Sequence, residues 1–277
     1  MARSETQTRV ITATGLALFS LVWLFVVSES LFLGIALMVL LLCVQEYRTI
    51  ISSKGIVVQP VILFGTALMG FTACYFYSKG VAQTGHLALL FTVLNPVVYS
   101  LLRTKDKKRQ LVIYFGSLLW FVLPLFLMVY LRTTPTMPIG PKLIIWMVLV
   151  VAVNDVAAYF GGRRFGKTPL APKISPKKTR EGSFCGLLGG LLVGFAAQPY
   201  LFPFAEYWEL LLLILVIVPV SQAGDLAESV FKRKFGVKDS GTILPGHGGM
   251  LDRFDAMLFA LPAFGILIYA LGLEQRW

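Results

Sequence analysis

The sequence predicts an all-α, polytopic membrane protein with about nine transmembrane helices. Of its 277 residues, 57% are hydrophobic and only 14% are charged, whereas a soluble domain is about half apolar and about a quarter charged. The mean hydropathy is +0.77. The apolar residues also form long runs, and a helix needs about 20 such residues to cross a bilayer. We therefore expect most of the hydrophobic surface to face lipid.

Nine apolar runs are candidates for these helices. The second run is short and is expected to form a tight hairpin with the first across Glu29 and Ser30. We divide the chain into N-terminal transmembrane helices, about five, in residues 1–150 and a C-terminal transmembrane region with cytoplasmic loops in residues 151–277. The predicted spans are residues 10–28, 31–45, 56–77, 86–102, 111–131, 142–160, 184–202, 208–223 and 255–273.

The basic residues predict the orientation of the spans. With the N-terminus inside and nine alternating spans, all but four of the 25 Lys and Arg residues fall on the inner side. The four exceptions are Lys79, Arg132, Lys142 and Arg276. Cytoplasmic loops of membrane proteins are enriched in Lys and Arg, so the N-terminus and the polar loops are expected to be cytoplasmic. The net charge of +11 is thereby explained by topology, and no nucleic-acid partner is expected.

Two pairs of acidic residues near the C-terminus are the main candidates for a metal site. Asp225 and Glu228 are three residues apart, on one face of a helix that leaves the bilayer. Asp252 and Asp255 repeat this spacing where the last span begins. Carboxylate oxygens suit Mg²⁺, so we expect Asp225 and Asp252 to be metal ligands and catalytic residues, with Asp239 and Asp255 as weaker candidates. Alternatively, these acids pair with nearby Lys and Arg in a solvated loop.

Basic side chains in the same regions are candidates for binding phosphate. Lys and Arg can neutralise a polyphosphate, and neighbouring glycines allow the backbone to approach it closely. His247 has no second histidine or cysteine nearby that would indicate zinc. It is a catalytic candidate, which we expect to shape its loop or to donate a hydrogen bond to phosphate rather than to act as a base. The basic candidates are Lys167, Lys177, Lys178, Arg233 and Lys238, the last also as a catalytic residue.

Asp155 lies several residues inside a predicted span. An ionisable residue at such depth is a functional candidate, and we expect Asp155 to contribute to substrate binding. The alternative is a structural hydrogen bond to Asn154 or to another helix. The loop that follows is rich in Gly, Lys and Arg but lacks the GxxxxGK[ST] spacing of a nucleotide-binding loop.

The order of these residues resembles a known family. The pattern runs Ser229-x-x-Lys232-Arg233, Lys238-Asp239-Ser240-Gly241, Pro245-Gly246-His247-Gly248-Gly249 and Asp252-Arg253-x-Asp255. It is similar to the signature of the phosphatidate cytidylyltransferases. Asn154-Asp155, Gly161-x-Arg163, Gly166-Lys167 and Ser175-Pro-Lys-Lys-Thr-x-Glu181-Gly182 are also similar to that family. The resemblance is specific over residues 150–256, while the preceding residues match only as hydrophobic spans.

The resemblance implies a multi-helix enzyme of the bacterial inner membrane, usually a homodimer, with a polar funnel open to the cytoplasm and to lipid. The implied reaction joins phosphatidic acid to CTP, giving CDP-diacylglycerol for phospholipid synthesis and pyrophosphate. The resemblance also implies dependence on Mg²⁺, with a second cation such as K⁺ at the same site. Asp225 and Asp252 are the closest matches to its metal ligands.

The residues suit this reaction on chemical grounds, although two other classes of protein are considered. A phosphate monoester is largely ionised at neutral pH, so the reaction needs cations to screen charge rather than a strong base. A transporter for an anionic solute would also have intramembrane acids and basic loops, but we find no internal repeat of the kind common in transporters. A CTP-dependent lipid kinase, such as a polyprenol kinase, would transfer the γ-phosphate of CTP instead.

Overall fold

The computed structural model describes residues 27–134, 138–172, 174–243 and 248–276. Within these ranges, eight helices are long and apolar enough to cross a membrane. The prediction of an all-α, multi-pass membrane protein is therefore confirmed. Each of the eight predicted spans from residue 31 onward coincides with one of these helices, and the first, residues 10–28, lies almost entirely outside the described residues.

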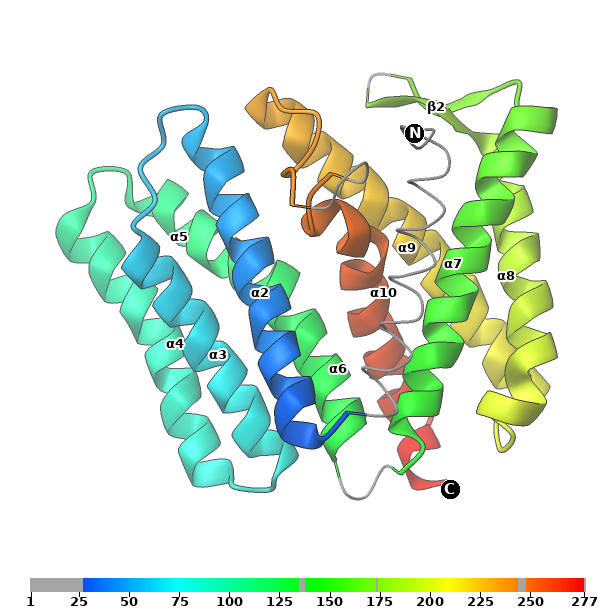
Figure 1. Cartoon of the computed structure of the whole chain (residues 1–277), viewed down its shortest axis with the longest axis horizontal. Helices are drawn as coiled ribbons and strands as arrows, with labels where there is room; N and C mark the ends of the chain where they lie inside the picture. Colours follow the sequence, from blue (N-terminus) through cyan, green and yellow to red (C-terminus); the bar gives the residue numbers. More distant parts are fainter. Residues whose placement is uncertain (1–26, 135–137, 173, 244–247, 277) are drawn as a thin grey trace, which may run out of the picture. The chain divides into compact units, whose positions relative to one another are not determined.

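The chain forms two compact units, and the first contains Met1–Pro135 and Phe235–Arg253. Its helices α3 and α4 pack side by side as a hairpin (Figure 1), and α2 packs against α3 and α6. A π-helical turn, η1, joins α5 to α6, so the three form one continuous rod. The bounds are α2 (Glu29–Ser52), α3 (Pro60–Ser78), α4 (Ala82–Arg103), α5 (Lys107–Ser117), η1 (Leu118–Val122) and α6 (Leu123–Thr133).

The second unit contains Thr136–Lys234 and Phe254–Trp277. Its most extensive helix contact joins α7 to α8, and a short antiparallel hairpin of β1 and β2 lies between them in the chain (Figure 1). The hairpin pairs Pro169 with Thr179 and Ala171 with Ser175. The bounds are α7 (Gly140–Phe165), β1 (Pro169–Ala171), β2 (Ser175–Thr179), α8 (Arg180–Leu201), α9 (Tyr207–Phe235), α10 (Leu251–Ala270) and η2 (Leu273–Gln275).

Two helices extend well beyond the spans predicted from hydropathy. Helix α2 ends at Ser52 instead of residue 45, and α9 ends at Phe235 instead of residue 223. The apolar run stops at the first polar residues, but the backbone continues as a helix. In α9 an ion pair between Lys232 and Glu228, one turn apart, supports the extension. The polar extensions of otherwise apolar helices therefore carry many of the candidate site residues.

A line of glycines lets α8 pack closely within the second unit. Gly182, Gly186, Gly190 and Gly194 are buried and recur every four residues, so they lie on one face of the helix. The indole N–H of Trp146 donates to the carbonyl oxygen of Gly194 at 2.9 Å. Small residues allow membrane helices to approach one another. The glycine face thus fixes α8 against α7, which carries Asp155.

Replacing Gly190 by Ile is expected to lower the free energy of unfolding by about 1–3 kcal/mol, because overpacking a close helix contact is destabilising. A Cβ atom at this position would lie 2.9 Å from Cγ2 of Val218. Thermal unfolding in detergent measures the change. Leu192→Ile is the matched control, because Leu192 is 73% exposed on the same helix. Equal unfolding temperatures for the two variants would contradict the packing argument.

Candidate functional site

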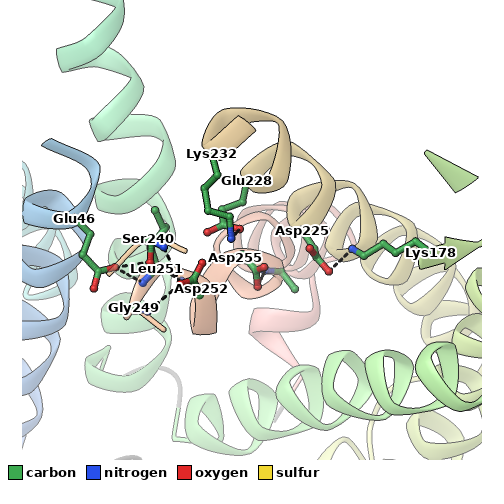
Figure 2. A network of polar contacts seen from close by, with 11 residues as sticks. Glu46, Lys178, Asp225, Glu228, Lys232, Ser240, Gly249, Leu251, Asp252 and Asp255 are labelled. Atoms are coloured by element: carbon green, nitrogen blue, oxygen red, sulfur yellow. Dashed lines mark hydrogen bonds and ion pairs between the residues drawn. The ribbon is translucent and has the colours of Figure 1, made fainter. Parts of the chain in front are cut away.

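Three carboxylates of the second unit form an acidic cluster, which we define as Asp155 on α7, Asp225 on α9 and Asp255 on α10. Their charges are close enough to interact with one another. The ammonium of Lys178, on β2, forms an ion pair with Asp225 (Figure 2). Lys178 also interacts with Asp155, and Lys232 with Asp255. The sequence prediction placed all three acids and Lys178 in a functional site, and the structure brings them together.

A chain of neutral hydrogen bonds orients Asp155. The side-chain amide of Asn154, which is fully buried, donates to Oδ1 of Asp155 at 2.9 Å. Gln222, on α9, in turn donates to Oδ1 of Asn154 at 2.7 Å, and the hydroxyl of Ser183, on α8, donates to Gln222. Three helices thus hold the amide that contacts Asp155. The hydrogen bond to Asn154 considered in the sequence is present, and Asp155 still belongs to the acidic cluster.

The loop that carries the predicted phosphate-binding lysines is tied to the start of α8. The carboxylate of Glu181 accepts hydrogen bonds from the backbone N–H groups of Lys167 at 3.1 Å and Thr168 at 3.2 Å. On β2, Lys178 is partly buried beside Asp225, whereas Lys177 is exposed. The two neighbouring lysines therefore have different surroundings. The side chains of Lys167 and Arg233 are also exposed.

Glu228 and Asp225 both lie on α9, but Glu228 is buried whereas Asp225 is partly exposed. The side chain of Glu228 is only 1% exposed and lies 2.6 Å from the ammonium of Lys232. Burying a carboxylate without a cation or hydrogen-bond donors would be costly, so this pair is well placed to stabilise the end of α9. Of the two acids, Asp225 is the more accessible for binding a ligand.

In the first unit, Asp252 is held by the backbone of two short stretches, residues 240–241 and 248–251, which we call the loop arms. Its Oδ2 atom accepts hydrogen bonds from the N–H groups of Ser240 and Gly249, both at 2.9 Å. Gly248 has a φ of +80°, and a Cβ atom there would lie 2.5 Å from the same oxygen. Glycine is therefore required at this turn.

The neighbouring candidates of the first unit differ in accessibility. Lys238 and Asp239 are exposed beside Ser240. His247 lies outside the described residues. Asp252 is one helical turn before Asp255 on α10.

Glu46, at the polar end of α2, also contacts the loop arms and was not singled out in the sequence. It is 4% exposed, and it accepts hydrogen bonds at 2.8 Å from the hydroxyl of Ser240 and the N–H of Leu251 (Figure 2). The N–H of Met250 donates to it at the same distance. Ser240 is 194 residues away in the chain, so sequence spacing could not reveal the contact. The available signal was an acid directly after the predicted span of residues 31–45, where ionised groups are costly.

The donor chemistry of the acidic cluster fits a cation. Across the described ranges, no three His, Cys, Asp or Glu side chains are arranged to hold a metal ion by themselves. Mg²⁺ does not require such a cage, because it is usually bound through one or two carboxylates, with water and phosphate oxygens completing its shell. The ammonium of Lys178 against Asp225 already places a positive charge at this cluster.

Comparison with known proteins finds relatives that are similar to about half of this chain. A phosphatidate cytidylyltransferase of Staphylococcus epidermidis is 50% identical over 129 residues, which are 47% of this chain and 50% of that protein. Phosphatidate cytidylyltransferases of Staphylococcus saprophyticus and Staphylococcus aureus are each 47% identical over the same shares of the two chains. The matched part is thus about half the length of these bacterial relatives.

A broader match identifies the family. The sequence model of the cytidylyltransferase family matches residues 7–271. This range takes in all eight described membrane-spanning helices, the acidic cluster, the loop arms and Glu46. The chain therefore belongs to the cytidylyltransferase family.

Proposed function

We propose that the chain transfers the cytidylyl group of CTP to phosphatidic acid, giving CDP-diacylglycerol and pyrophosphate. The observation that carries this proposal is the acidic cluster with Lys178 at its edge, in a member of the cytidylyltransferase family. Relatives that match half of their length to this chain are named for that reaction. A multi-pass membrane protein is also suited to a lipid substrate, which would reach it from the bilayer.

The proposed reaction exchanges one phosphoanhydride bond for another. An oxygen of the phosphatidate phosphate attacks the α-phosphorus of CTP, and a new P–O bond forms. The bond between the α-phosphorus and the oxygen leading to the β-phosphate breaks, and pyrophosphate leaves. Both reactants are anions, so the main barrier is electrostatic, and fixed positive charges are expected to lower it.

In this proposal the acidic residues bind the metal ion and the basic residues bind phosphate. Asp225 would hold Mg²⁺ together with Asp155 or Asp255, and Asp252 and Asp239 are further candidate ligands. Mg²⁺ would neutralise phosphate charge and stabilise the leaving pyrophosphate. Lys178 would contact the phosphates of CTP. Lys167, Lys177, Arg233, Lys238 and His247 are proposed as additional phosphate contacts.

Three further features complete the proposal. The distribution of Lys and Arg supports cytoplasmic loops and a cytoplasmic N-terminus in a bacterial inner membrane. A K⁺ ion as second cation and a homodimer follow from the resemblance described above. CTP is expected in the cytoplasm, so this orientation would give the polar loops access to it.

Labelled CTP distinguishes cytidylyl transfer from the two alternatives. With CTP labelled at the α-phosphate, the label should enter lipid, and with γ-labelled CTP it should enter pyrophosphate. A lipid kinase would give the opposite result, with the γ-label in lipid. A transporter would move solute across sealed vesicles without consuming CTP. The measurement uses purified protein with Mg²⁺ and either phosphatidic acid or a polyprenol as the lipid acceptor.

Asp225→Asn is expected to lower the rate of cytidylyl transfer by at least about 100-fold, because it removes the charge of a proposed metal ligand while keeping its size. Asp252→Asn should also lower the rate, because Asp252 is proposed as a further candidate ligand. The measurement is initial rate against Mg²⁺ concentration. Asp106→Asn is the matched control, since Asp106 caps α5 and Asn caps a helix equally well. Near-wild-type activity of Asp225→Asn at limiting Mg²⁺ would refute the metal assignment.

Lys178→Ala is expected to raise the KM for CTP by about 10-fold or more, with a small effect on the KM for phosphatidic acid. The phosphates of CTP are charged in both ground and transition states, so losing such a contact changes KM more than kcat. Lys177→Ala is the comparison variant, because the exposed side chain of Lys177 is proposed only as an additional phosphate contact and should give a smaller rise in the KM for CTP. Kinetics with each substrate varied separately in a neutral detergent provide the comparison. Equal effects of the two variants would argue against a special role for the ion pair.

A further inference from the structure

Glu46 joins the two loop arms through a single carboxylate. Its Oε2 atom accepts hydrogen bonds from the hydroxyl of Ser240 in the first arm and from the N–H of Leu251 in the second, both at 2.8 Å. Its Oε1 atom accepts from the N–H of Met250, also at 2.8 Å. These contacts connect parts of the chain that are about 200 residues apart in sequence, so the arms are fixed by α2 rather than only by their own sequence.

We propose that Glu46 is a positioning residue that sets the orientation of the Asp252 carboxylate for cation binding. The inference rests on the proposed function, because it takes Asp252 as a metal ligand. Glu46 does not need to contact a substrate or the reacting atoms in this role. It acts through the loop arms, which hold Asp252.

Ser240 connects the two carboxylates. Its hydroxyl donates to Glu46 at 2.8 Å and accepts from the N–H of Asp252 at 3.3 Å. Its own N–H donates to Oδ2 of Asp252 at 2.9 Å. A displacement of the arm at Ser240 would therefore change the contacts of both acids at once. The second N–H donor to Asp252, from Gly249, lies directly before Met250, which Glu46 also holds.

The glycines of the loop arms make room for Glu46. A Cβ atom at Gly241 would lie 2.7 Å from Oε1 of Glu46, and one at Gly249 would collide with Glu46 and with the hydroxyl of Ser240. The close backbone approach that the sequence suggested for phosphate is occupied at these two positions by a carboxylate. The two glycines therefore leave the space that the side chain of Glu46 occupies.

The helix that carries Glu46 is itself fixed. The hydroxyl of the next residue, Tyr47, donates to the carbonyl oxygen of Ile113 on α5 at 3.1 Å. The ring of Tyr47 also packs edge-on against Phe121. At the end of α2, the hydroxyl of Ser53 donates to the carbonyl oxygen of Phe235 at 3.3 Å. Glu46 therefore projects from a rigid support, which is what a positioning residue requires.

The role requires two acceptor oxygens, so glutamine cannot replace glutamate. An ionised carboxylate only accepts hydrogen bonds, whereas an amide has one acceptor oxygen and one NH₂ donor. If the amide oxygen of Gln occupied the Oε2 position, its NH₂ group would face the N–H of Met250. In the reverse orientation the NH₂ group would face the N–H of Leu251. In either case one backbone N–H loses its acceptor, although the size of the side chain is kept.

Two measurements on the full-length protein in detergent test the proposal. Hydrogen–deuterium exchange reports the protection of the amides in residues 248–251. Binding of Mn²⁺ to the substrate-free protein, measured by electron paramagnetic resonance, reports the cation site without requiring activity. Glu46→Gln should speed exchange in this arm by at least about 10-fold and weaken Mn²⁺ affinity by about 10- to 100-fold. Glu46→Asp, which keeps both oxygens, should recover part of each effect.

Gln45→Glu is the matched control, because it makes the reverse change at the adjacent, exposed position of α2. It should leave exchange and Mn²⁺ affinity unchanged. If Glu46→Gln does not fold, Ser240→Ala replaces it, since it removes one of the three donors to Glu46 and the hydroxyl that accepts from the N–H of Asp252. Unchanged exchange, or faster exchange with unchanged Mn²⁺ affinity, would overturn the positioning role. If the wild-type protein binds Mn²⁺ in this Glu46-dependent way but transfers no cytidylyl group, the proposed function fails and the positioning role stands.

Discussion

The structure depends on how it stabilises carboxylates at the polar ends of apolar helices, because an ionised oxygen near a bilayer needs donors or cations around it. Three solutions are present. Glu228 is buried against Lys232, Asp225 pairs with a lysine from the β-hairpin, and Glu46 is surrounded by neutral N–H and O–H donors. Only in the second case is the carboxylate substantially accessible, so the manner of stabilisation separates a candidate ligand site from structural acids.

The membrane-spanning helices could be predicted from the sequence because hydrophobic runs of sufficient length have few alternative structures in a bilayer. Their ends could not. The spans predicted from hydropathy end before the first charged residue after the apolar run, whereas helix α2 continues past Glu46 and helix α9 continues past Asp225. The helical hydrogen bonds extend into the polar region, where contacts with other parts of the chain stabilise them. These contacts depend on tertiary structure, which periodicity does not encode.

The residues of the candidate site could also be predicted in part from the sequence, whereas their contacts depend on the tertiary structure. Asp155, Asp225 and Asp255 stand out in the sequence as acids in or beside apolar runs, and Lys178 stands out as a basic residue of a polar loop. The four residues do lie together. Lys177 and Lys178 could not be told apart in the sequence, because only the folded chain brings Lys178 against Asp225 and leaves Lys177 exposed. Glu46 could not be linked to Ser240, because the link exists only after the chain has folded. The type of a residue indicates which chemistry its side chain can perform. Only the fold shows which other side chains it contacts.

The fit of two glycines against one carboxylate has a consequence for how this protein can vary. A side chain at position 241 or 249 would collide with Glu46, so neither glycine is free to change while the glutamate remains. Conversely, a smaller residue at position 46 would leave a polar hollow lined by backbone N–H groups without acceptors, which is unfavourable. The three positions are therefore expected to show epistasis: single substitutions should be harmful, and tolerated variants should change the helix and the loop together.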